Sequence, residues 1–189
     1  MSSTAPVTQP SAVSGEDSVA SGASLLRAIR DGQLPSPPAA QLLGLDLVDI
    51  RDGHVEFDFH PATRFDNGQA AVLGGVLAAV LHFAVSTAVL TACDIGTMVV
   101  TSNHNLSFIR PVHPDSGTMR CVGTLIHRGH RSAFADATLT DSAGLIHVRA
   151  TATCLMLTGA AHNHDGPPPV RPIDGHEPLD MESLLPHAR

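Results

Sequence analysis

The segment AAVLGGVLAAVLHFAVSTAVLTAC, residues 70–93, contains no Asp, Glu, Lys or Arg. A charge-free run of this length is typical of a membrane span or of a helix that is buried on nearly every side. A helix over residues 75–92 would be about 27 Å long at about 1.5 Å per residue, so its length allows either structure. The glycine pair near its start and the single histidine within it, His82, both need an explanation.

The sequence around this segment favours the buried helix. The segment is rich in Ala, Ser, Thr and Gly, and it lacks flanking Lys or Arg clusters and an aromatic belt. Residues 45–50 and 54–60 alternate around a turn, which predicts a hairpin. Further extended runs follow at residues 97–110, 117–127, 132–141 and 145–157. We therefore predict an α+β domain in which a curved antiparallel sheet wraps one long central helix.

Short segments flank this domain. The chain is divided into a disordered leader, a short helical segment, the domain and a disordered Pro- and His-containing tail, at residues 1–23, 24–44, 45–158 and 159–189. The leader lacks the basic start and apolar core of a secretion signal. Two helical patterns, at residues 24–31 and 39–43, are separated by three prolines that act as breakers, namely Pro35, Pro37 and Pro38.

Charge and cysteine content limit the classes of function. The chain has 11 Lys plus Arg against 18 Asp plus Glu, so it offers no broad basic surface for nucleic acid or an anionic membrane. The cysteines are too few and too dispersed for a disulfide framework or a zinc motif, and they fit a reduced, cytoplasmic setting: Cys93, Cys121 and Cys154. The tail histidines lie in too flexible a context for a metal site: His162, His164 and His176.

Local motifs add a family resemblance. The segment from Asn67 to Phe83 has the spacing of N-x-x-G-x-x-H-G-G-x-x-x-x-L-x-D, and TSNHNLSFIRP, residues 101–111, resembles a strand that ends in Phe-x-Arg-Pro. HRGHRSA at residues 127–133 resembles a basic turn, and DSAG at 141–144 a last hairpin. With the order of elements, residues 45–157 resemble the phenylacetate-degradation (PaaI-like) type of hotdog-fold acyl-CoA thioesterases. The resemblance implies a hotdog fold, hydrolysis of an acyl-CoA or carrier-bound acyl thioester, and a homodimer or homotetramer.

Two positions depart from the family pattern. Leu73 replaces the motif histidine, and His82 stands where the family has a carboxylate that acts on a thioester at the helix N-terminus of the neighbouring subunit. Imidazole can take a proton from water near neutrality, so His82 is the candidate base. The alternative is a core histidine, bonded to a backbone carbonyl or a serine, in a protein without hydrolytic activity. His60 and Asp66 are fallback bases.

The start of the helix supplies the electrophilic half of the candidate site. Gly74 and Gly75 would let a substrate approach the free N–H groups of the helix, with the Gly75 N–H polarising the thioester carbonyl. Close packing of the helix on a strand is the alternative reason for these glycines. Asn67 matches the family asparagine and would position a water or the carbonyl, or it is simply part of a turn.

Three further sets of side chains complete the candidates. Ser86, four residues after His82, shares its helix face and would orient the ring or a water. Thr101 resembles a hydroxyl residue beside the family's acyl pocket. Three arginines suit the phosphates of coenzyme A, or are plain solvated charge: Arg110, Arg128 and Arg131.

The resemblance leaves three functions open. The first is thioester hydrolysis, which needs no metal or redox cofactor. The second is a non-catalytic protein that binds or scaffolds acyl thioesters and has lost the base. The third is a hotdog dehydratase, suggested by His60-Pro61 and by the Gly75-Val76-Leu77 helix start. A dehydratase needs a helical Glu or Asp where this chain has Val80.

Overall fold

Six strands form one antiparallel sheet in the order β1-β2-β4-β5-β6-β3. A computed structural model describes residues 21–157. Its strands are β1 (Leu45–Arg51), β2 (His54–Phe59), β3 (Met98–Phe108), β4 (Met119–Arg128), β5 (Ser132–Thr140) and β6 (Ile146–Leu157). The predicted hairpin and the four later strands are confirmed. Residues 1–20 of the predicted leader and the predicted tail at 159–189 lie outside the described residues. The end of the predicted leader is corrected, because Ser21 caps the first helix and residues 22 and 23 begin it.

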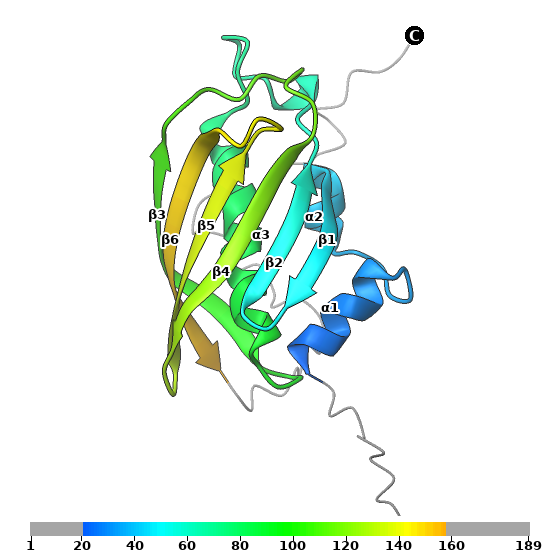
Figure 1. Cartoon of the computed structure of the whole chain (residues 1–189), viewed down its shortest axis with the longest axis vertical. Helices are drawn as coiled ribbons and strands as arrows, with labels where there is room; N and C mark the ends of the chain where they lie inside the picture. The colour runs from blue at the N-terminus through cyan, green and yellow to red at the C-terminus, as the bar shows by residue number, and fades with distance from the viewer. Residues whose placement is uncertain (1–20, 158–189) are drawn as a thin grey trace, which may run out of the picture.

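The central helix α3 (Gly74–Thr91) lies along the curved sheet, which wraps it (Figure 1). Its buried apolar side chains, from Leu77 to Val89, are at most 3% exposed. The helix is long and apolar enough to cross a membrane by length and composition alone, yet half of it is buried within the domain. A curved antiparallel sheet around one helix is the hotdog fold, as predicted. One expectation needs correction, because α3 is not covered on every side: Gly75 and His82 lie on an exposed stripe.

A glycine on β4 sets how closely α3 approaches the sheet. A Cβ atom at Gly123 would lie 2.2 Å from the carbonyl oxygen of Ala84, in the middle of the helix. The backbone of α3 therefore rests almost directly on the backbone of β4, and no side chain fits between them. This contact fixes the position of the helix that carries both glycines and His82.

Two short helices, α1 (Gly22–Arg30) and α2 (Pro38–Leu43), precede the sheet, as the sequence predicts. A reciprocal pair of side-chain bonds between Ser21 and Ser24 caps the start of α1. A Cβ atom at Gly22 would lie 2.0 Å from the carbonyl oxygen of Leu90, so α1 is docked tightly on α3. Pro38, predicted as one of the breakers that separate the two helices, is itself the first residue of α2, where the missing N–H costs nothing.

The strand β3 forms one end of the sheet and, within residues 21–157, pairs only with β6. Its other edge is open over eleven residues, and apolar side chains along or just after it are exposed: Met98, Val100, Phe108 and Ile109. A long open edge of this kind is a template for pairing with another chain.

Candidate active site

The N-terminus of α3 is open. The N-cap residue Leu73 is 52% exposed and supplies no side-chain cap, so the first N–H groups of the helix remain available to a ligand. No described atom lies within 4 Å of a Cβ placed on Gly75, whereas a Cβ on Gly74 would contact the Phe108 ring at 3.4 Å. Packing therefore accounts for Gly74 only in part and does not account for Gly75.

A groove of about 350 Å³ lies beside this helix end, between Gly74 and Leu77 of α3 and the segment from Phe108 to Val112. Arg110 lines the groove and donates a hydrogen bond to the carbonyl oxygen of Ile146. The ring of His147 fastens the same segment, with Nδ1 2.9 Å from the Pro111 carbonyl oxygen. A guanidinium is thus held at the rim of the groove next to the helix N-terminus.

His82 lies on the exposed stripe of α3 and faces a second imidazole, His104 of β3. The ring centroids are 5.7 Å apart and the ring planes meet at 71°. His104 is half-buried, and its Nε2 atom has no hydrogen-bond partner among the described residues. His82 itself is exposed, so within the described residues it is not a core histidine.

His104 was not predicted as a site residue, and a β-bulge explains why. The register shifts between Thr101 and Asn103 of β3. Thr101 pairs with buried Cys154 and His104 with buried Ala152, so both face the helix although they are three residues apart. Strict alternation would have placed them on opposite faces.

The pKa of His104 is predicted to lie below the ordinary value for histidine. Burial lowers its pKa, and the neighbouring His82 lowers the pKa further. The folded protein then binds fewer protons at His104 than the unfolded chain, so its stability falls as the pH drops below about 6.5 toward the folded pKa. An NMR titration of the imidazole protons would measure this, and a His82→Gln variant should raise the pKa of His104. A His104 that titrates at or above the value in an unfolded peptide would contradict the prediction.

Asn67 and Ser86 make local backbone contacts. The Asn67 side-chain oxygen accepts a hydrogen bond from the Gln69 N–H at 2.8 Å, as in an ordinary turn. The Ser86 hydroxyl donates to the carbonyl oxygen of His82 at 2.8 Å. The proton of Ser86 therefore goes to the helix backbone, and its oxygen lone pairs are what it could offer to the His82 ring or to a water. Thr101 lies on the helix-facing side of β3, with Oγ1 3.5 Å from the sulfur of Cys154.

The three arginines are not brought together within one chain. Arg110 lies near the N-terminus of α3, whereas Arg128 and Arg131 flank the β4–β5 turn at the opposite end of the sheet (Figure 1). The fallback bases make local contacts. His60 bonds Asp46 at 3.0 Å, and Asp66 accepts from the Gly68 N–H at 2.6 Å.

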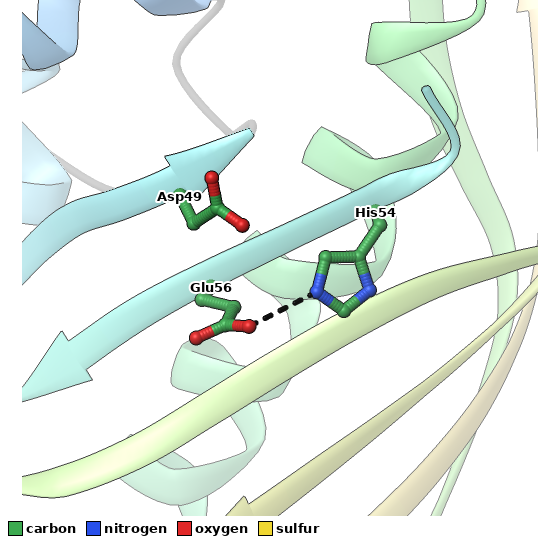
Figure 2. A group of neighbouring side chains, drawn as sticks. All are labelled: Asp49, His54 and Glu56. Carbon is green, nitrogen blue, oxygen red and sulfur yellow. Dashed lines mark hydrogen bonds and ion pairs between the residues drawn. The ribbon is translucent and has the colours of Figure 1, made fainter. Parts of the chain in front are cut away.

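A histidine and two carboxylates gather on the first hairpin, which β1 and β2 form. Figure 2 shows Asp49 on β1 beside His54 and Glu56 on β2, whose candidate ligand atoms lie within 4.8 Å of one another. Arg51 lies 2.6 Å from Asp49, and Arg120 pairs with Glu56. The bond from His54 lowers the pKa of Glu56, and Arg120 lowers it further. Both carboxylates are already neutralised, so this cluster is an ion-pair network.

A hotdog domain with an uncapped helix N-terminus beside an arginine-rimmed groove has the features of an acyl-thioester-binding protein. Comparison with known proteins agrees. The sequence model of the Thioesterase superfamily matches residues 69–146. A phenylacetic acid degradation-related protein of Ralstonia eutropha is 30% identical, with a TM-score of 0.64 over 69% of this chain and 98% of that one. The chain belongs to the thioesterase superfamily.

Two more distant structures share the fold. The PaaI protein from the phenylacetic acid degradation operon of Escherichia coli is 18% identical, with a TM-score of 0.64 over 74% of this chain and 98% of that one. The smu.793 protein of Streptococcus mutans, bound to acetyl CoA, is 19% identical, with a TM-score of 0.56 over 60% of this chain and 89% of that one. No curated protein matches the sequence. Family membership supports acyl-thioester hydrolysis as the general class of activity.

Proposed function

We propose that this protein hydrolyses an acyl-CoA, or an acyl thioester carried on a carrier protein, with His82 as the general base. The observation that carries the proposal is an exposed imidazole on the open stripe of α3, at the position of the family's carboxylate. The uncapped helix N-terminus supplies the complementary electrophilic half of the site. The acetyl-CoA bound to the Streptococcus mutans protein supports coenzyme A as the thiol portion of the substrate.

The site requires a second subunit. His82 lies seven residues after Gly75, about 10 Å along the helix axis, so one chain does not bring its base to its own first N–H groups. The open edge of β3 offers a place for a second copy to pair. We propose a homodimer, alone or within a tetramer, in which His82 of one subunit serves the helix N-terminus of the other.

The reaction follows from these positions. A water attacks the thioester carbonyl while His82 takes its proton, and the Gly75 N–H stabilises the oxyanion that forms. The tetrahedral intermediate then collapses, the C–S bond breaks, and the thiolate recovers the proton from His82. Asn67 lies on the loop before α3, where its amide nitrogen would position the water or the carbonyl. Arg110 is the arginine best placed to bind a phosphate of coenzyme A. A cytoplasmic location would give the protein access to this substrate.

A non-catalytic binding protein is the second candidate, favoured by the lack of a carboxylate at residue 82. A dehydratase is not supported, because Val80 is fully buried where that reaction needs an acid. The test is a panel of acyl-CoAs with thiol release monitored. Release above the uncatalysed rate supports hydrolysis, whereas binding of acyl-CoA without release of thiol would identify the binding protein.

A charge on the open edge of β3 is predicted to weaken the dimer. Val100 is 38% exposed on this strand, so it would lie within the proposed interface. Val100→Lys would place an uncompensated charge from each copy there and weaken self-association by more than about tenfold. Sedimentation velocity would measure the shift toward monomer, and thiol release should fall with it. Full activity in a strictly monomeric variant would contradict the shared site.

A further inference from the structure

A second cavity, of about 270 Å³, lies between the two N-terminal helices, strands β1 and β2, and α3. Helix α1 contributes Leu26 and Ile29, strand β2 contributes Phe57, and α3 contributes Phe83, Ser86 and Leu90. None of the described residues that line this cavity is charged. Because α1 is docked on α3 through the close contact at Gly22, the cavity is already formed without a ligand.

The lining excludes a charged ligand. The hydroxyl groups at the cavity belong to Ser36, Ser86 and Thr87. That of Ser86 is engaged with its own helix, 2.8 Å from the His82 carbonyl oxygen, and Thr87 is only 8% exposed. A phosphate or a carboxylate placed here would lose its hydration without a counter-charge. The cavity therefore suits an apolar group.

The position of the cavity links it to the base. Ser86 lines it and follows His82 by one helical turn on the same face, so the Cβ atoms of these two residues lie about 5–6 Å apart. We propose that this cavity binds the acyl chain of the thioester substrate, and that the preferred chain is aliphatic with about eight to ten carbons. The inference rests on the proposed function, which places the reacting carbonyl at His82.

The volume sets the chain length. A cavity of about 150 Å³ holds benzene, so one of 270 Å³ holds a group of about ten carbons. Each buried methylene should raise the affinity about fourfold until the cavity is full. The helices that close the cavity precede residues 69–146, the part matched by the family model. Chain-length preference is thus assigned to the N-terminal segment of this protein.

The test compares a cavity-filling variant with a matched control on the full-length protein. Ile29→Phe places an aromatic ring in the cavity, whereas Leu42→Phe introduces the same ring at a position that is 70% exposed on α2. With acetyl-, butyryl-, octanoyl- and decanoyl-CoA, Ile29→Phe should lower kcat/KM for the two longer substrates by at least about tenfold and leave acetyl-CoA unchanged. Leu42→Phe should change none of them. An equal effect of Ile29→Phe on all four substrates would overturn the inference.

Two further measurements separate this inference from the proposed function and from a folding defect. Phe83→Ala enlarges the cavity and should shift the preference toward longer acyl chains, which is the opposite of the effect expected for Ile29→Phe. Binding of a non-hydrolysable decanoyl-CoA thioether, measured by calorimetry, should weaken at least about tenfold in Ile29→Phe even if no thiol is ever released. Weaker binding in Ile29→Phe without any thiol release would support the acyl-binding site and contradict the proposed hydrolysis. A change in oligomeric state with unchanged decanoyl binding would make the cavity a contact between copies and reject the acyl site.

Discussion

Replacing His82 with glutamine is expected to lower kcat/KM for acyl-thioester hydrolysis by about 10²–10⁴-fold, the usual contribution of a general base. Glutamine keeps a polar side chain at an exposed position of α3, so the free energy of unfolding should change by less than about 0.5 kcal/mol. Thiol release and thermal unfolding, measured on the same preparation, separate catalysis from stability.

Two matched variants sharpen this result. His60→Gln makes the same replacement at another exposed histidine, which bonds Asp46 away from α3, and should leave the rate unchanged. His82→Asp restores the carboxylate of the family pattern and should retain far more activity than His82→Gln. If wild-type hydrolysis survives intact in His82→Gln, another group is the base. Neutral His104, which faces the same ring at a centroid distance of 5.7 Å, is then the next candidate.

The elements of the fold could be predicted because the strands and the long helix have different sequence patterns. The charge-free run predicted the long helix, found at Gly74–Thr91, and alternation predicted the strands to within about two residues. The open stripe of α3 could not be predicted in the same way. Small residues such as Ala and Ser occur both in protein cores and on surfaces. The sequence around His82 therefore does not mark which face of the helix the sheet leaves uncovered.

The candidate site was only partly predictable. Spacing alone indicated Gly75 and His82, but their environment depends on tertiary structure. His104 was missed because the bulge in β3 changes which residues face the helix. Arg128 looked equivalent to Arg110 because both follow extended runs. In an antiparallel sheet, however, successive strands run in opposite directions, so their last residues lie at opposite ends of the sheet. Only strand order and pairing show which strand ends lie together.

Replacing Gly123 with alanine should destabilise the fold by about 3 kcal/mol, the upper range for overpacking a core. The new Cβ would lie 2.2 Å from the carbonyl oxygen of Ala84 and 3.1 Å from a methyl of Val55. A helix backbone cannot yield as a side-chain tip does, so α3 must move away from β4. Urea unfolding would measure the loss. Thr124→Ala, on the next residue of β4, is half-buried without this contact and should cost less than about 1 kcal/mol.

The same substitution tests whether the placement of α3 controls the site. The helix carries Gly75 at its start and His82 near its middle, so displacing it from β4 moves both groups relative to the neighbouring subunit. At a temperature where Gly123→Ala remains folded, kcat should fall by about a hundredfold, the cost of a misplacement of about 1 Å. An unchanged unfolding midpoint together with an unchanged kcat would mean that α3 lies farther from β4 than the Gly123 contact indicates.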